Sequence, residues 1–428
     1  MPRYTVRTHH LEGQQTDIQY AIDFPRVETL ELADDFLTFR AWAFAPSTSP
    51  LSFVFSFDDQ TQYLPNTERP DVRDFYNLDS ALCGIHIVAP ILESFRFGVI
   101  IGERLIWLAQ VEFTKLQVLE GSHQYLFLDN DDNQSVDQYS GKLKIDPENM
   151  GAWREYFNDI NLWLHSNPAK FVFCLAPAKE FIFPEFYPIQ RLGITPTDQF
   201  VSEFGGKAAV INPIELLSRQ KNLTYMQSDT HWTDFGAQLV AASICSELKI
   251  GFQPTNFDYK IKQFTGDLGI KFNPQRTEYG LFADTTSLAS LTYDNCIPVR
   301  GNVISISNPL AALNETCLIF GSSSAESVAK QLSSTFTRVV RVFSGADIDY
   351  SIVALEQPTC IIILFSTRFL IRAPSTNFNI GSEILRKVEC MSAHEVAELK
   401  HGLLTSTGTP ADHYYVALLE NLLAMTNP

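Results

Sequence analysis

Four short apolar runs beyond residue 116 constrain the fold of this 428-residue chain more than any other feature. Such runs, separated by segments with apolar residues at helical spacing, are typical of buried strands that alternate with helices. We therefore expect a parallel sheet covered by helices on both faces, with its chemistry at the carboxyl ends of the strands. The predicted strands span residues 171–175, 317–320, 339–343 and 360–365, and two of the predicted helices span 153–164 and 234–248.

The first 115 residues show a different pattern, in which short segments of alternating character are bounded by turn residues. Regular short strands of this kind are typical of a small antiparallel β-sandwich. Residues 1–25 lack a firm pattern and are expected to form a loose lead-in, and Arg69-Pro70-Asp71-Val72 a polar loop. The predicted strands span 36–44, 51–57, 83–88, 95–101 and 104–111, with a hairpin turn at Gly102-Glu103.

Length and pattern together predict two domains, a β-sandwich accessory domain over residues 1–115 and an α/β domain over 116–428. Within the second domain, residues 250–312 are polar and weakly periodic, so we expect a long excursion over the site. Residues 393–404 and 412–425 are predicted to form two amphipathic helices that pack on this domain.

Composition excludes several classes of partner and compartment. The formal net charge is −17, which argues against nucleic acid and anionic membrane surfaces as partners. The seven cysteines are scattered and form no C-x-x-C motif, so we expect reduced, buried thiols. No secretory apolar region follows the N-terminus, and no apolar run is long enough to span a bilayer, so the sequence predicts a cytoplasmic protein without a transmembrane segment.

Asp229-Thr230-His231-Trp232 is the first stretch whose residues could take part in catalysis. In an extended segment, residues two apart point to the same side, so Asp229 can orient the imidazole of His231. A carboxylate that accepts from one ring nitrogen leaves the other nitrogen free to take a proton from a nucleophile. The alternative is a helix N-cap beside a surface histidine.

The nucleophile predicted for this base is Ser323, in Phe320-Gly321-Ser322-Ser323-Ser324. An apolar run, a glycine and then serines predict a strand that turns sharply into a helix. The backbone N–H groups at the start of that helix can hold a developing oxyanion. An ordinary strand-to-helix connection is the alternative, and the serine triplet leaves the assignment open by one residue, although the register from Gly321 favours Ser323.

Both stretches belong to an ordered set of motifs that resembles the SGNH-hydrolase-like acetyltransferases, the family of the alginate O-acetyltransferases of the AlgX and AlgJ type. Asp229-Thr230-His231-Trp232 is similar to the D-x-H-W signature of that family, and Gly321-Ser322-Ser323 stands where it has Gly-Asp-Ser. The resemblance covers roughly residues 116–375. Its other matches are Val118-Leu119-Glu120-Gly121 through Tyr125-Leu126-Phe127-Leu128, Gln138-Tyr139-Ser140-Gly141, Ala176-Pro177-Ala178-Lys179, Pro184-Glu185 and Gly266-Asp267-Leu268. The resemblance implies that the domain over 116–428 is SGNH-hydrolase-like.

The resemblance implies a serine-dependent O-acetyltransferase that modifies a glycan or polysaccharide acceptor through an acyl-serine intermediate, with Ser323, His231 and Asp229 as the catalytic residues. An esterase or deacetylase of the same fold is one alternative. A degenerate, non-catalytic glycan-binding protein is another, because Ser322 replaces the aspartate of the family and a sandwich is appended. This chain also has Thr367-Arg368 where the family often has a Glu-Arg pair. Acetyl-CoA is a candidate acyl donor, and no bound cofactor is assigned.

Several further residues carry alternative interpretations. Lys179 is expected to be solvated, Trp232 either to stack on a sugar or to lie in the core, and Arg368 either to bind an anionic group or to form a surface ion pair. Trp42 and the segment around Arg69 resemble β-sandwich modules of glycan-modifying proteins, which a purely structural sandwich explains equally well. No metal is assigned, because the histidines outside the His231 stretch, such as His9, His10, His394 and His401, lack ligand-like spacing.

Overall fold

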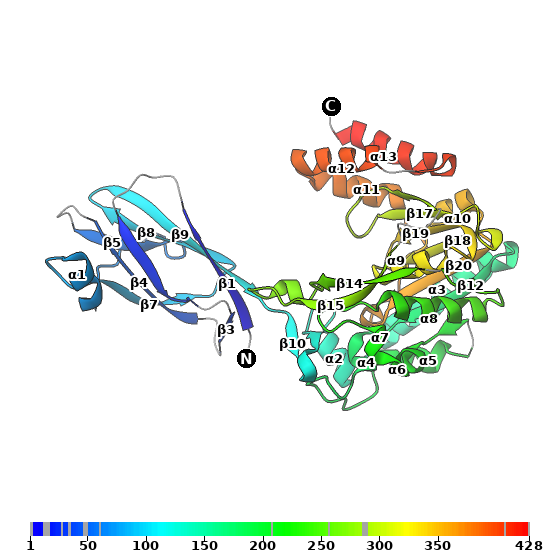
Figure 1. Ribbon diagram of the computed structural model, residues 1–428, viewed down its shortest axis with the longest axis horizontal. Coiled ribbons are helices and arrows are strands. Elements are labelled where there is room, and N and C mark those ends of the chain that lie inside the picture. Colours follow the sequence, from blue (N-terminus) through cyan, green and yellow to red (C-terminus); the bar gives the residue numbers. More distant parts are fainter. Residues whose placement is uncertain are drawn as a thin grey trace. The chain divides into compact units, whose positions relative to one another are not determined.

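The computed structural model describes residues 3–11, 18–26, 29–32, 36–45, 50–59, 61–206, 209–255, 257–284, 290–405 and 408–426. The chain divides into two compact units (Figure 1). The first comprises Met1–Val118 and Gly269–Arg276, and the second comprises Leu119–Leu268 and Thr277–Pro428. The prediction of a single boundary between residues 115 and 116 placed Gly269–Arg276 in the second domain, which is wrong. The carbonyl of Lys271 instead accepts a hydrogen bond from the Thr5 hydroxyl within the first unit.

Two antiparallel sheets form the first unit, in the orders β3-β1-β9-β8-β5 and β2-β4-β7-β6. Phenylalanines from both sheets meet in one core, where the rings of Phe39 and Phe55 lie 5.3 Å apart and neither is exposed. The elements are β1 Arg3–His10, β2 Gln19–Phe24, β3 Thr29–Glu31, β4 Phe36–Phe44, β5 Leu51–Phe55, β6 Thr67–Glu68, α1 Pro70–Tyr76, β7 Leu82–Pro90, β8 Ser94–Ile101 and β9 Arg104–Lys115.

Two expectations for this unit are wrong. The N-terminal residues include strands β1 and β2 rather than a loose lead-in, and β1 pairs with β9 from Tyr4 to His10. The sequence signal is weak because only Thr5 and Val6 of β1 are buried. The expected polar loop contains helix α1, which Pro70 begins and which buries Val72 against Trp42.

The second unit is built on a seven-stranded sheet in the order β13-β12-β20-β18-β19-β17-β16. Strands β13, β12, β20, β18 and β19 are parallel, whereas β17 and β16 pair antiparallel at one edge. The strands are β12 Lys170–Ala176, β13 Val210–Ile211, β16 Leu291–Asp294, β17 Val303–Ser307, β18 Leu313–Gly321, β19 Phe336–Phe343 and β20 Cys360–Ser366. Two small sheets pair β10 Val118–Glu120 with β11 Leu126–Leu128 and β14 Asp258–Phe264 with β15 Glu278–Asp284.

Helices cover both faces of this sheet because its strands alternate apolar residues between two cores. Leu318 and Phe320 of β18 join the core of α3, α5 and α10–α13, whereas Cys317 and Ile319 join the core of α6, α8 and α9. The helices are α2 Ser135–Ser140, α3 Pro147–Ser166, α4 Lys179–Ile182, α5 Pro196–Phe204, α6 Ile214–Ser218, α7 Lys221–Thr224, α8 Asp234–Glu247, α9 Ser324–Leu332, α10 Tyr350–Glu356, α11 Ile380–Cys390, α12 Ala393–Thr405 and α13 His413–Thr426.

Residues 250–312 are more regular than expected. Strands β16 and β17 extend the central sheet, and β14 pairs with β15 as a two-stranded ribbon. The apolar run of β17 is too short to predict a strand by itself. Pairing with β19, which contributes Val339–Val342, decides its conformation. Strands β14–β17 thus occupy part of the segment for which the sequence predicted a long excursion.

All seven cysteines are free thiols, of which five are buried and Cys296 and Cys390 are exposed. The expectation of buried thiols is wrong for these two. None of the helices in the described part of the chain has the length and apolar character needed to cross a membrane.

Candidate active site

A loop of residues 225–232, between α7 and α8, carries Asp229 and His231. Its ends meet in an antiparallel bridge between Tyr225 and Trp232. The Asp229 carboxylate accepts the backbone N–H of His231 at 2.7 Å, so the segment is a turn rather than the extended segment that the sequence predicted. Asp229 is not the N-cap of α8 either, because the Thr233 hydroxyl accepts the backbone N–H of Gly236 there.

The turn holds the side chains of Asp229 and His231 in contact with Ser323. Nδ1 of His231 donates to Oδ1 of Asp229 at 2.7 Å, and the Ser323 hydroxyl donates to Nε2 of His231, also at 2.7 Å. The second oxygen of Asp229 accepts the backbone N–H of Asp267 at 3.1 Å. A continuous hydrogen-bonded path therefore runs from a buried carboxylate through an imidazole to a serine hydroxyl.

Ser323 lies where β18 ends and α9 begins. A Cβ on Gly321 would lie 2.9 Å from both the carbonyl oxygen of Leu364 and the Cβ of Ala325, so glycine is needed for this close approach. Ser322 is buried, whereas Ser323 is exposed. The first backbone N–H groups of a helix have no intrahelical acceptor and lie at the positive end of its dipole. The start of α9 thus favours negative charge beside the Ser323 hydroxyl.

The charges around His231 adjust its proton affinity. Burial lowers the pKa of His231, but the hydrogen bond and charge of Asp229 and the charge of Asp267 outweigh this effect, so the net pKa lies above the ordinary 6.5. Burial raises the pKa of Asp229, but its hydrogen bonds with His231 and the charge of that ring outweigh burial, so the net pKa lies below the ordinary 3.8 and Asp229 stays ionised. This pair is suited to a base that becomes an imidazolium beside a fixed negative charge.

Lys179 is buried and donates hydrogen bonds to the backbone of the 225–232 loop, so the expectation of a solvated side chain is wrong. The residue is only 2% exposed, and its Nζ donates to the carbonyls of Met226 at 3.1 Å, Gln227 at 2.8 Å and Asp229 at 2.6 Å. Burial lowers the pKa of Lys179 to about 8. The sequence signal was the position of Lys179 directly after the strand end at Ala176-Pro177, but nothing in the pattern showed what covers it.

Two acidic residues hold the loop from the ribbon side. The Glu278 carboxylate accepts the backbone N–H of Ser228 at 2.6 Å and that of Gln227 at 3.0 Å. The Asp267 carboxylate accepts the backbone N–H of Thr230 at 2.8 Å. A Cβ on Gly266 would lie 2.2 Å from the Ser228 carbonyl oxygen, so glycine is required beside the loop. Gly266-Asp267 therefore positions Asp229, and Glu278 was missed because no motif marked it.

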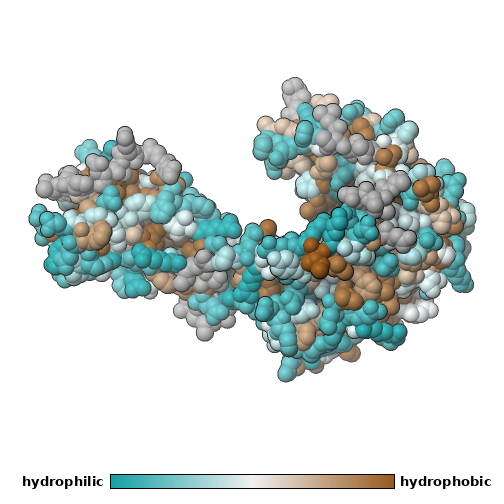
Figure 2. All heavy atoms as spheres, viewed as in Figure 1, coloured by the Kyte–Doolittle hydropathy of each residue, from teal (hydrophilic) through white to brown (hydrophobic). Residues whose placement is uncertain are grey.

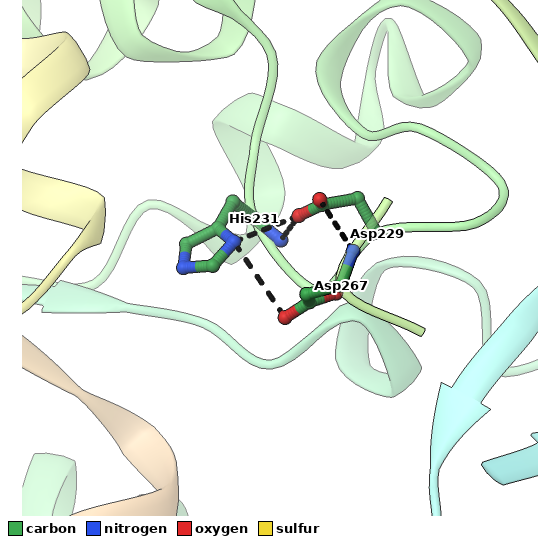
Figure 3. A group of neighbouring side chains, drawn as sticks. All are labelled: Asp229, His231 and Asp267. Atoms are coloured by element: carbon green, nitrogen blue, oxygen red, sulfur yellow. Dashed lines mark hydrogen bonds and ion pairs between the residues drawn. The ribbon is translucent and has the colours of Figure 1, made fainter. Parts of the chain in front are cut away.

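Asp229, His231 and Asp267 also form a group with the spacing of metal ligands (Figure 3). One donor atom from each lies within 4.8 Å of the others. Nδ1 of His231 lies 2.7 Å from the nearer Asp229 oxygen and 3.8 Å from the Asp267 oxygen. A cation there would have to displace the proton on Nδ1 and its hydrogen bond to Asp229. The two carboxylates can stabilise a cationic imidazole equally well. Both oxygens of Asp229 already accept hydrogen bonds, from His231 and from the backbone N–H of Asp267, which favours stabilisation of the imidazole over metal binding.

A pocket of about 280 Å³ opens beside Ser323 and His231. Residues 176–179, at the carboxyl end of β12, contribute to the lining, as do Phe343 and Arg368. The pocket includes Glu180, whose carboxyl is buried and whose pKa is raised by burial to about 7. Arg368 forms a 3.6 Å ion pair with Asp131 and also lines this pocket. Its position therefore agrees both with an ion pair and with binding of an anionic group, the two interpretations that the sequence left open.

Trp232 and Thr367 have structural contacts. Trp232 is 5% exposed and its indole N–H donates to the Ser327 hydroxyl at 2.9 Å, so it lies in the core and does not present a face to a sugar. The Thr367 hydroxyl accepts the backbone N–H of Ala178 at 2.9 Å. The threonine at the first position of the expected Glu-Arg pair thus holds the strand end that lines the pocket.

No family model and no curated protein matches this sequence. Among solved structures, PatB1 from Bacillus cereus aligns with 61% of this chain and 98% of its own, at 15% identity and a TM-score of 0.42. The O-acetyltransferase domain of AlgJ from Pseudomonas putida aligns with 66% of this chain and 98% of its own, at 14% identity and a TM-score of 0.40. A DHHW family protein from Eubacterium siraeum aligns with 65% and 92%, at 10% identity and a TM-score of 0.39.

Proposed function

We propose that this protein is a serine-dependent O-acetyltransferase that modifies hydroxyl groups of a polysaccharide or glycan precursor. The observation that carries the acyl-transfer part is the pair of 2.7 Å hydrogen bonds joining Asp229, His231 and Ser323 at the start of α9. A serine hydroxyl held by a neutral imidazole, with a carboxylate behind it, is the arrangement that activates a serine as a nucleophile. The glycan acceptor rests on the sequence resemblance.

In the first half-reaction, Oγ of Ser323 attacks the acyl carbonyl carbon while its proton passes to Nε2 of His231. Asp229 stabilises the imidazolium that forms, and the positive end of the α9 dipole stabilises the oxyanion. The bond between the acyl carbon and the donor's leaving group then breaks, and Nε2 returns the proton to that leaving group. The product is an acetyl ester on Ser323.

In the second half-reaction, an acceptor hydroxyl gives its proton to Nε2 of His231 and attacks the ester carbonyl. The bond between the acyl carbon and Oγ breaks, and Ser323 recovers the proton. Water in place of the sugar hydroxyl would make the same site an esterase, because the residues and the steps are identical. We propose the sugar hydroxyl as acceptor and an activated acetyl ester or thioester, with acetyl-CoA as the candidate, as donor.

Mass spectrometry of the intact protein after incubation with 4-nitrophenyl acetate tests the acyl-serine step. The wild type should gain one acetyl group, and Ser323→Ala should gain none. Ser382→Ala, an exposed serine on α11, is the matched control and should label like the wild type. A wild-type protein that forms no adduct and releases no nitrophenol contradicts the proposal and supports the non-catalytic alternative.

The acceptor is tested separately, by comparing acetylated glycan with free acetate after the donor is consumed. A transferase produces mainly acetylated glycan when a suitable polysaccharide is present, whereas an esterase produces acetate at the same rate with or without it. If Ser323 is acylated but no glycan is acetylated, the acyl-serine intermediate is supported and the protein is an esterase rather than a transferase.

A further inference from the structure

A second pocket, of about 450 Å³, lies within the second unit between the α7–α8 connection and the β14–β15 ribbon. Tyr225 lines both this pocket and the one beside Ser323, so the 225–232 loop contributes residues to each. Neither the proposed reaction nor the residues that support Asp229 require a cavity at this position. The pocket therefore needs its own explanation.

Five aromatic rings contribute to the lining. Tyr125, Tyr225 and Phe235 come from the body of the unit, and Tyr259 and Tyr279 come from β14 and β15. Tyr279 is 75% exposed and Tyr259 is 36% exposed, so both present ring surface to solvent. The ribbon also exposes aliphatic side chains, and Figure 2 shows apolar atoms gathered on the surface over β14 and β15. Exposed rings that converge on a cavity are a common feature of binding sites.

Polar groups in the same lining discriminate between ligand classes. Asn222 and Gln227 contribute amides, Thr233 a hydroxyl and Glu278 a carboxylate. Glu278 and Thr233 already have hydrogen-bond partners in the protein. An acyl chain that covers the amides of Asn222 and Gln227 would bury hydrogen-bonding atoms that it cannot satisfy, at a cost of about 1–3 kcal/mol for each group left without a partner. An anionic ligand would meet Glu278, and the described part of the lining contains no lysine or arginine. A neutral ligand with an apolar face and several hydroxyls satisfies both the rings and the amides.

We propose that this pocket binds a neutral sugar residue of a glycan, with Tyr279 as the ring on which the sugar stacks. The inference goes beyond the proposed acyl transfer, because binding at this pocket needs neither Ser323 nor His231. It adds a glycan-binding site in the same unit as the candidate active site, at a distance set by the 225–232 loop.

The pocket is connected to the catalytic loop through Glu278. This residue lines the pocket and accepts the backbone N–H groups of Gln227 and Ser228, the two residues before Asp229. Gln227 itself also lines the pocket. A sugar hydroxyl that binds the Glu278 carboxylate or the Gln227 amide thus contacts the groups that position Asp229.

Isothermal titration calorimetry of the full-length Ser323→Ala protein tests the site, because this variant cannot turn over its ligand. The probes are three neutral hexasaccharides, maltohexaose, cellohexaose and laminarihexaose. Trigalacturonate is the anionic comparator and dodecanoate the acyl comparator. We expect at least one neutral hexasaccharide to bind, and both comparators to fail. Adding Tyr279→Ala should weaken binding about fivefold to tenfold, the effect of losing one stacked ring.

Tyr414→Ala, which removes an exposed tyrosine on α13 outside the pocket, is the matched control and should leave the dissociation constant unchanged. Thermal unfolding of each variant shows that it is folded. The proposal is overturned if no neutral hexasaccharide binds, if Tyr279→Ala binds as tightly as its parent, or if dodecanoate binds and depends on Tyr279. Binding that persists in a wild-type protein without acyl labelling would retain this site and reject the acyl-transfer function.

Discussion

The ammonium group of Lys179 donates a 2.6 Å hydrogen bond to the backbone carbonyl of Asp229. Two further carbonyls, of Met226 and Gln227, accept from the same nitrogen. The direction of the Asp229 side chain is therefore set by a buried cation 50 residues away in the sequence as well as by the hydrogen bond with His231. Lys179 is a positioning residue, since its Nζ contacts the loop backbone rather than the reacting atoms.

Lys179→Met keeps the apolar stem and removes the three donated hydrogen bonds. We expect acylation of Ser323 to slow by about 100-fold, the effect of misplacing a catalytic group by roughly an ångström. Lys142→Met, at a largely exposed lysine, is the control and should acylate like the wild type. The measurement is the burst rate with 4-nitrophenyl acetate, and equal rates in the two variants would remove the positioning function.

The same variant tests the protonation of Lys179. Burial lowers its pKa to about 8 in the folded protein, against the ordinary 10.5. Between these two values the unfolded chain holds a proton that the folded protein has lost, so stability rises with pH. The free energy of unfolding of the wild type, relative to Lys179→Met, should therefore increase from pH 8 to pH 10.5. A flat or falling difference would place the pKa outside this window.

Ser323 is expected to be the nucleophile of the serine triplet. Ser323→Ala should abolish acyl labelling, whereas Ser322→Ala should label measurably because the Ser322 side chain is buried and the hydroxyl bonded to His231 belongs to Ser323. Peptide mapping of the labelled protein identifies the acylated residue. An adduct on Ser322 or Ser324 in the wild type would move the assignment by one residue.

The acylation rate should rise with pH through an inflection above 6.5, because Asp229 and Asp267 raise the pKa of His231. Asp229→Asn removes the main raising influence, so burial should move the inflection to lower pH, and the plateau rate should fall on the order of 10³-fold to 10⁴-fold. Glu180 lies in the same pocket and titrates near pH 7. The inflection should therefore persist in Glu180→Gln if it belongs to His231.

Glu180→Gln is also expected to stabilise the protein at neutral and higher pH. Burial raises the pKa of Glu180 from 4.5 to about 7, so between these values the folded protein holds a proton that the unfolded chain has lost. The wild type thus loses stability as pH rises from 4.5 to about 7, on the order of 3 kcal/mol in total. Chemical denaturation of both proteins above the isoelectric point near 4.9 measures the difference, which should grow up to about pH 7 and then stay constant.

Glu278→Ala should slow acylation about tenfold or more, because hydrogen bonds to a charged group contribute about 1.5–3 kcal/mol and two loop N–H groups lose theirs. The half-saturating concentration of a small ester should change little, since Glu278 does not line the pocket beside Ser323. Glu215→Ala, an exposed residue on α6, is the control. A loss confined to ester binding, with the rate constant unchanged, would contradict a positioning function.

The local sequence pattern was sufficient to predict the strands that contain a continuous run of buried residues. The apolar runs at 171–175, 317–320, 339–343 and 360–365 fall within β12, β18, β19 and β20, because a strand buried on both faces has to be apolar throughout. The same pattern failed for β1 and α1. There the burial of Val6 and Val72 comes from strands and side chains distant in the sequence.

The amino-acid sequence by itself determined which chemical groups are present: a carboxylate two residues before a histidine, and a serine after a strand-ending glycine. Only the tertiary structure decided that these groups meet, that Lys179 is buried beneath them and that Glu278 holds the loop from the ribbon. Residue identity and periodicity are local properties of a chain. Hydrogen-bond distances and the pKa values that depend on burial are set by segments such as 176–179, 225–232, 266–278 and 321–324, which are close only in the folded protein.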